Sequence, residues 1–275
     1  MSAALDKLFA NLPRLPSIPK VVQDLIASLC KEDVDISDLV AQVKQDQSLS
    51  ARVLAMANSS QYGVSKKIGA IDQAVTLIGL SALRSLVIAS GMSRAFSKVE
   101  GVDMRAFWKH GLVTAGVARV IGKGKGVNAE FAYTAGLMYQ IGELIIHLAY
   151  PAASKQLLRD NGPKGVELLK VERSLTETDH CEVGQEMAVR WNFPVEIRNA
   201  LRWYAQPLEA EAEPMAAVVH ISAQIAEGLE KGLGAEEISV GLDTRVLARL
   251  SMERPDTVWR IESCMDLPAA SEQLL

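Results

Sequence analysis

The chain has 275 residues, of which 49% are hydrophobic and 23% are charged, and this composition excludes a largely disordered or fibrous protein. Only 5% of the residues are aromatic, which is typical of tightly packed helices rather than of a β-sandwich. The 33 acidic residues outnumber the 29 basic ones. Because proteins that bind the phosphate backbone normally carry a positive surplus, we expect no nucleic-acid partner.

Cysteine spacing and the distribution of apolar residues indicate the compartment. The cysteines Cys30, Cys181 and Cys264 lie far apart, so neither a disulfide framework nor a thiolate zinc site is indicated. No uncharged apolar run reaches membrane-spanning length, and the first residues lack the apolar stretch of a secretory signal. We therefore expect a cytoplasmic protein with no membrane partner.

In the first hundred residues, apolar side chains recur at helical spacing. The pattern predicts amphipathic helices over residues 21–29, 36–43, 49–57, 71–78 and 83–88. Asp46 or Ser48 can cap the third of these helices at its N-terminus. A polar loop follows at residues 58–63, and Gly79 lies between the last two helical patterns.

The second half continues in the same style and shows no long strand-like alternation. Helical periodicity covers residues 107–121, 129–149, 164–173, 180–191 and 215–229. The acidic stretch at residues 208–214 is predicted to be a solvated linker, and the pattern weakens into a short helical region after Gly234. The fold class predicted from these patterns is all-α.

The histidines are the first candidates for metal binding or acid–base chemistry. His110 lies at the start of an apolar helix, where it could point into a bundle or be a core histidine satisfied by one hydrogen bond. His180 follows Asp179 at the expected start of another helix. His147 is seven residues after Gln140 and so lies near the same helical face. No HExxH, GxSxG or glycine-rich nucleotide motif is present, and no His-Asp dipeptide.

Several motifs follow one another in a characteristic order. They are Leu12–Pro19, Asp46–Leu54, Ala57–Ser59, Ala70–Leu80, Phe107–His110, Ala135–Gly142, His180–Gly184 and Trp191–Pro194. Together they resemble the HDOD domain, the HD-related output domain of bacterial signalling proteins. The resemblance implies an HDOD-type multi-helical bundle, with an N-terminal helical subdomain at residues 1–100, an HD-like helical subdomain at 101–207 and a C-terminal helical extension at 208–275.

The chain departs from the HD hydrolases where their metal ligands stand. The His-Asp pair of those enzymes is replaced here by Tyr139-Gln140, and a His-His pair near the end of the domain by Trp203-Tyr204. A phenol, whose pKa is about 10, must lose its proton to bind a metal, and a glutamine offers only a neutral carbonyl. The resemblance thus implies a vestigial pocket without metal or other cofactor, formed by His110, Tyr139, Gln140 and His180.

We therefore predict a non-catalytic bacterial signalling protein that acts through protein–protein interaction. By resemblance, its partners are two-component or cyclic-dinucleotide pathway proteins. In the polar loop, Asn58, Ser59 and Tyr62 are candidate contact residues. The alternative role of this loop is a helix C-cap in which Asn58 adopts the left-handed conformation.

Two other functions remain open at this point. The first is a divergent metal-dependent HD-superfamily phosphohydrolase, with a divalent ion held by His110, Glu143, His147 and His180. Glu143 and His147 are four residues apart and share a helical face. The second is a small-nucleotide sensor that uses the vestigial pocket. The sequence indicates neither the oligomeric state nor a role for residues 208–275.

Overall fold

The computed structural model describes residues 3–12, 18, 22–23, 36–58, 64, 67–157 and 164–272, and all regular secondary structure in these ranges is helical. The all-α prediction is therefore confirmed. In chain order the helices are α1 (Ala3–Ala10), α3 (Ile36–Gln45), α4 (Gln47–Ala57), α5 (Ile71–Ala95), α6 (Met104–Gly122), α7 (Ala129–Met138), α8 (Ile141–Ala149), α9 (Pro151–Leu157), α10 (Gly165–Thr176), α11 (His180–Arg190), α12 (Val195–Trp203), α13 (Pro214–Glu230), α14 (Ala235–Gly241), α15 (Thr244–Arg249), α16 (Arg254–Glu262) and α17 (Leu267–Glu272).

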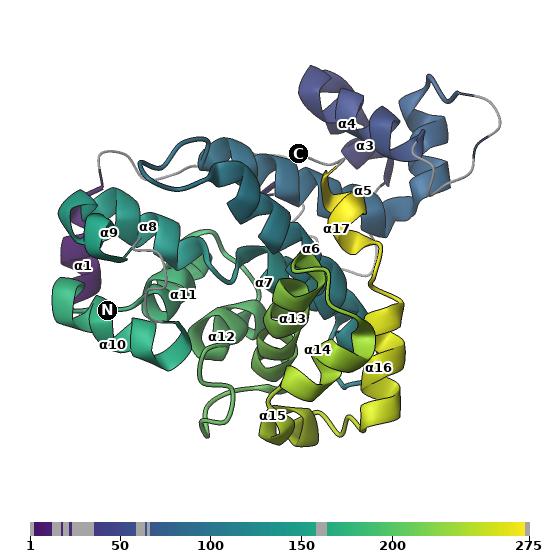
Figure 1. Cartoon of the computed structure of the whole chain (residues 1–275). Helices are drawn as coiled ribbons and strands as arrows, with labels where there is room; N and C mark the ends of the chain where they lie inside the picture. Colours follow the sequence, from purple (N-terminus) through teal and green to yellow (C-terminus); the bar gives the residue numbers. More distant parts are fainter. Residues whose placement is uncertain are drawn as a thin grey trace.

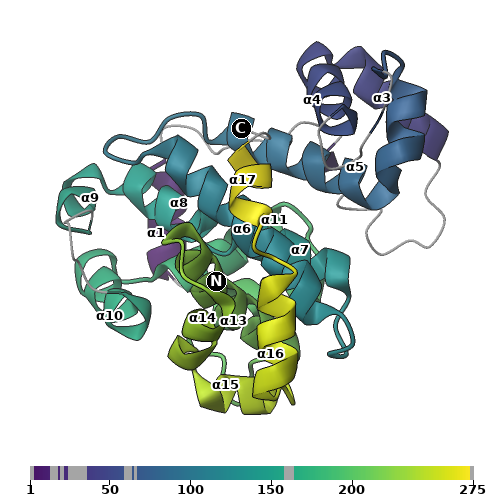
Figure 2. The same ribbon diagram turned by 45° about the vertical axis from the view of Figure 1, so that its right-hand side comes forward.

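A small lobe made of α3, α4 and the first part of α5 stands apart from the other helices in both views (Figures 1 and 2). The predicted cap of α4 is confirmed, because the Asp46 carboxylate accepts a hydrogen bond from the Leu49 amide at 3.0 Å. The same carboxylate also pairs with Arg94 on α5 at 2.6 Å. Asp46 thus joins the N-terminus of α4 to the end of α5 that leads into the rest of the molecule.

The two arms of α5 meet at a sharp bend. Residues Ile71–Leu80 and Ala82–Ala95 are inclined by 101°, and Gly79, near the end of the first arm, has φ +82° and ψ 163°. This backbone conformation is essentially restricted to glycine, because a Cβ atom would collide with the neighbouring peptide groups. Glycine at position 79 therefore permits the turn that sets the direction of the small lobe.

Substitution Gly79→Ala is expected to destabilise the protein by about 1–3 kcal/mol, the usual cost of a non-glycine residue in this region. Among the described residues, no atom of another part of the chain lies within 4 Å of the point that an added Cβ would occupy, so the cost is expected from the backbone and not from packing. Urea unfolding of wild type and variant measures it. Gly69→Ala is the matched control, since that position also has open space but no positive φ; an equal loss in both variants would contradict the explanation.

Helix α6 lies between two apolar cores. On one side its Leu112 and Ala115 belong to the large core that also takes in the small lobe and helices α7 to α12. On the other side Val113, Val117 and Ile121 are completely buried in a second core together with residues of α13 to α16. Helices α13 to α16 thus cover one side of α6, and this part of the predicted C-terminal extension belongs to the packed structure.

The first helix of the chain packs far from the small lobe. Helix α1 contacts α8 and α11. Lys7 pairs with Glu177 at 3.3 Å, and the Arg190 guanidinium lies 4.1 Å from the centre of the Phe9 ring. Helix α1 therefore lies with helices of the second half of the chain rather than with α3 and α4.

Some helix boundaries differ from the prediction. The helix predicted over residues 129–149 is broken at Tyr139 and Gln140, and the weak pattern after Gly234 forms the short helices α14 to α17. Helices this short are stabilised by tertiary packing rather than by their own periodicity, which explains why the pattern was weak. Most of the helix predicted at residues 21–29 lies outside the described residues. The part of the chain that is described contains no single helix long and apolar enough to cross a membrane.

Candidate vestigial metal site

His110 projects from the second turn of α6 and has a partner at each ring nitrogen. Its Nε2 atom lies 2.5 Å from the Tyr139 hydroxyl, at the junction between α7 and α8. Its Nδ1 atom lies 2.7 Å from the Glu230 carboxylate, in the last turn of α13. The C-terminal extension therefore contributes a charged group directly to the pocket that the sequence predicted from His110 and Tyr139.

His180 is the first residue of α11 and has the same type of surroundings. The Asp179 side chain caps this helix by accepting a hydrogen bond from the Glu182 amide at 2.8 Å. Nδ1 of His180 lies 2.6 Å from the Glu172 carboxylate, which also accepts a hydrogen bond from the His180 backbone amide at 2.9 Å. Nε2 lies 2.6 Å from the Tyr204 hydroxyl. Both His180 and Glu172 have side chains that are only 2% exposed, so this is a fully buried His–Glu pair.

The two tyrosines connect the contacts of His110 with those of His180. The rings of Tyr139 and Tyr204 are 4.7 Å apart between centroids and lie edge to face, at 84°, a favourable geometry for two aromatic rings. Both occupy the positions at which the resemblance expects metal ligands. His110, Tyr139 and His180 thus belong to one group of contacts, and Gln140 lies beside them within hydrogen-bonding reach of Glu143.

Burial and charge determine the protonation of this group. Burial raises the pKa of both tyrosines well above 10, and the neighbouring Glu143 raises them further, so the phenols stay neutral. Burial by itself would lower the pKa of His180, but contacts with Cys181, Glu172 and Glu143 raise it well above 6.5. The Glu172–His180 contact is therefore an ion pair at neutral pH.

The donor set does not fit a divalent metal ion. Each ring nitrogen of His110 and His180 already has a protein partner, and the neutral phenols are poor ligands. Within the described ranges, no group of three or more His, Cys, Asp or Glu side chains converges so as to hold a metal. Of the alternative ligand set, His147 is buried, which lowers its pKa, and its Nδ1 atom has no hydrogen-bond partner. The residues His110, Glu143, His147 and His180 therefore do not form a common ligand cage.

Two members of this group had no signal in the sequence. Glu172 and Glu230 belong to no motif, and each shares its helix with another glutamate, Glu167 or Glu227. Tyr204 stood out only as a departure from the family pattern. The carboxylates could be recognised only from the structure, since 120 residues separate Glu230 from His110.

Asn58, the first residue of the candidate interaction loop, has a defined role. Its side-chain amide donates to the Leu54 and Ile68 carbonyls at 2.7 and 2.9 Å, and its Oδ1 accepts a hydrogen bond from the Ile68 amide at 2.8 Å. Asn58 is the C-cap of α4, but with φ −92° it does not adopt the left-handed conformation considered from the sequence. Its side chain also joins the last turn of α4 to Ile68, shortly before α5 begins. Ser59 and Tyr62 lie outside the described residues.

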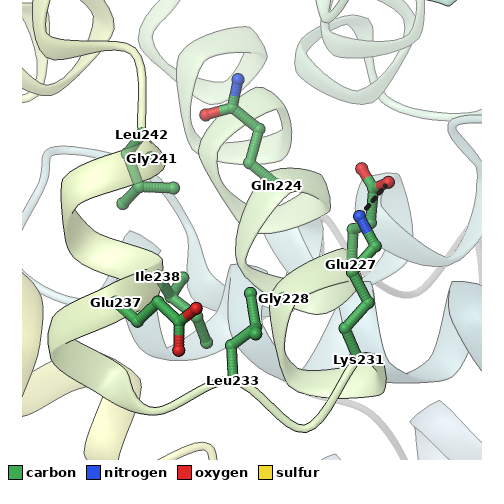
Figure 3. A pocket seen from close by; sticks show the side chains of 9 residues that line it. All are labelled: Gln224, Glu227, Gly228, Lys231, Leu233, Glu237, Ile238, Gly241 and Leu242. Atoms are coloured by element: carbon green, nitrogen blue, oxygen red, sulfur yellow. Dashed lines mark hydrogen bonds and ion pairs between the residues drawn. The ribbon is translucent and has the colours of Figure 1, made fainter.

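A shallow pocket of about 270 Å³ lies between α13 and α14 (Figure 3). Three of its polar side chains are already paired: Glu227 binds both Lys231 and Lys164 at 2.9 Å, and Gln224 accepts a hydrogen bond from the Asp243 amide at 3.2 Å. Gly228 lies close against Ile238 on the pocket wall. Because these polar groups already have protein partners, this pocket is a weaker candidate than the His–Tyr group.

Comparisons with known proteins agree with this fold. The HDOD domain model matches residues 15–207. An uncharacterized protein of Treponema pallidum (strain Nichols) is 27% identical over 206 residues, which make up 74% of this chain but 39% of that protein. The chain therefore spans about two fifths of the length of this curated relative.

Solved structures resemble the chain over nearly its whole length. A proposed phosphohydrolase of Shewanella amazonensis SB2B has a TM-score of 0.82 and 28% identity, with 100% of this chain and 99% of that chain covered. An HDOD domain protein of unknown function from Geobacter sulfurreducens has a TM-score of 0.80 and 25% identity, covering 99% and 97%. A proposed signal transduction protein of Marinobacter aquaeolei VT8 shares the fold, with a TM-score of 0.78, 20% identity and coverage of 99% and 65%. Since the family model spans more than half of the sequence, the chain belongs to the HDOD domain family.

Proposed function

We propose that this HDOD protein is a non-catalytic signalling protein that acts by binding other proteins. The observation that carries the proposal is the occupation of all four ring nitrogens of His110 and His180 by protein groups. A metal-dependent hydrolase needs such nitrogens as ligands, and it needs anionic ligands to hold the ion that activates water. Tyr139 and Gln140 provide neutral groups instead.

Metal analysis combined with an activity assay tests this proposal. The purified protein is incubated with Mn²⁺, Mg²⁺ or Zn²⁺, desalted and analysed by mass spectrometry, and then assayed with generic phosphomonoesters and phosphodiesters. We expect far less than one metal ion per chain and no turnover above buffer. Stoichiometric metal together with turnover that His110→Ala abolishes would overturn the proposal.

The relatives favour one competing function. The Shewanella amazonensis protein, which resembles this chain over its full length, is described as a proposed phosphohydrolase. On this view the chain is a divergent metal-dependent HD-superfamily phosphohydrolase with rearranged ligands. The same assay separates the two functions, because only the hydrolase requires a bound ion and a His110-dependent rate.

The loop closed by Asn58 is the proposed contact surface for partners from two-component or cyclic-dinucleotide pathways. Replacing Asn58 by alanine removes three hydrogen bonds that hold the loop ends together. Asn199→Ala is a matched control, since Asn199 ties the Glu211 carbonyl and the Glu213 amide at 2.9 Å in a different loop.

We expect Asn58→Ala to weaken binding to purified receiver-domain and cyclic-dinucleotide enzymes of the same host, measured by titration calorimetry. Asn199→Ala is expected to leave it unchanged. Equal affinities for wild type and Asn58→Ala would remove this loop as the contact surface.

A further inference from the structure

A continuous series of side-chain contacts crosses the second half of the protein, from the C-terminal extension to α10. In order of contact, its members are Glu230, His110, Tyr139, Tyr204, His180 and Glu172. We call this series the tyrosine–histidine chain. We propose that it couples α13 to α10, so that a change at the Glu230 carboxylate, at one end, alters the Glu172–His180 contact at the other end. This inference goes beyond the proposed function and does not depend on which partner the protein binds.

The first step of the coupling is the position of a proton on His110. A carboxylate can only accept, so Nδ1 of His110 must donate to Glu230. In the neutral ring, Nε2 is then left to accept a hydrogen bond from the Tyr139 hydroxyl. Without Glu230 the ring is free to carry its proton on either nitrogen. The Tyr139 hydroxyl can then either donate a hydrogen bond to Nε2 of His110 or accept one from it.

The second step is the contact between the two tyrosines. Tyr139 is 5% exposed and Tyr204 is 8% exposed, and their rings touch edge to face at 4.7 Å between centroids. In a densely packed interior one ring cannot shift without moving the other.

The third step is the bond between Tyr204 and His180. The protonated ring of His180 donates from Nδ1 to Glu172 and from Nε2 to the Tyr204 oxygen. Tyr204 is therefore an acceptor towards His180, whereas Tyr139 is a donor towards His110. A change in the placement of Tyr204 alters the ion pair that holds the start of α11 on α10.

A second route between α13 and α10 lies at the surface and provides the control. Glu227, one turn before Glu230, pairs with Lys164 at the N-terminal end of α10. The Lys164 side chain is 80% exposed, and such pairs contribute little stability. Glu227→Ala removes this route and leaves the tyrosine–histidine chain intact, whereas Glu230→Ala does the reverse.

The test compares hydrogen exchange and ring ¹⁵N chemical shifts in wild type, Glu230→Ala, Glu230→Gln and Glu227→Ala. In Glu230→Ala we expect the His180 backbone amide, which donates to Glu172, to exchange about tenfold faster, within the usual range of coupling between sites. The ring signals of His180 are expected to shift as well. Glu230→Gln keeps an acceptor for Nδ1 and is expected to restore most of the protection.

The control variant Glu227→Ala is expected to leave the His180 signals unchanged. The proposal is overturned if Glu230→Ala also leaves them unchanged, or if Glu227→Ala changes them equally. Since Glu230 is 25% exposed at its side chain, we expect the variants to fold, and circular dichroism verifies this.

As a second measurement, Glu230→Ala and Tyr204→Phe are combined in a double-mutant cycle. Strictly additive stabilities would contradict the coupling.

Discussion

A chain that ends at residue 207, where the family match ends, is expected to aggregate or to unfold without cooperativity. The reason is the second core: Val113, Val117 and Ile121 on α6 are completely buried against α13 to α16. Exposing these side chains costs about 5–9 kcal/mol in lost apolar burial. This is comparable with the total stability of about 5–15 kcal/mol that a typical domain has.

Size-exclusion chromatography, dye binding to exposed apolar surface and thermal melting of chains 1–207 and 1–275 provide the measurement. A chain ending at residue 265 is the control, since it lacks only α17 and keeps the helices that form the second core. We expect this control to remain monodisperse and to melt cooperatively. A monomeric 1–207 chain with a sharp melting transition would show that the extension is separable from the fold.

Substitution Glu172→Gln is expected to destabilise the protein by about 3–5 kcal/mol at pH 6.5, because it leaves the buried His180 cation without its counter-charge. The glutamine side chain has nearly the same size and still offers a hydrogen-bond acceptor, so the variant removes the negative charge of Glu172 and little else. Urea unfolding measures the loss. The surface variant Glu167→Gln is the matched control on the same helix, since Glu167 pairs with Lys170 at an exposed position; it is expected to change stability by less than about 1 kcal/mol.

The same pair makes the stability of the wild type depend on pH. The folded pKa of His180 lies well above its unfolded value of about 6.5. Its contribution is therefore fully present below pH 6.5 and is lost as the pH rises through the folded pKa, with a slope of at most about 1.4 kcal/mol per pH unit. His147 and His220, whose pKa values burial lowers, act in the opposite direction and below this window.

Unfolding free energies between about pH 6.5 and 7.5 report mainly on this effect, because unfolded thiols, with a pKa of about 8.5, and phenols, with a pKa of about 10, are still almost fully protonated there. The wild type is expected to lose stability across the window. The Glu172→Gln variant is expected to show a flatter profile, since the charge that holds the proton on His180 is gone. Parallel profiles for the two proteins would mean that another group causes the pH dependence.

The resemblance in the sequence named three of the residues that the structure joins by side-chain contacts. His110, Tyr139 and His180 were expected to face one another, and the structure places them in one series of contacts. The role of Asn58 was harder to predict, since a polar residue after a helix is compatible with several turn geometries. Its bonds to Ile68, ten positions later, decided between them.

The sequence by itself determined the all-α class and most helix positions, and it reduced the N-cap of α4 to Asp46 or Ser48, because these follow from local periodicity and from hydrogen bonds between near neighbours. Only the tertiary structure decided that Glu172 and Glu230 bind the two histidines and that α13 to α16 cover one side of α6. Contacts between helices far apart in the chain depend on the packing of the whole bundle. No local pattern indicates which of many acidic residues is turned inward.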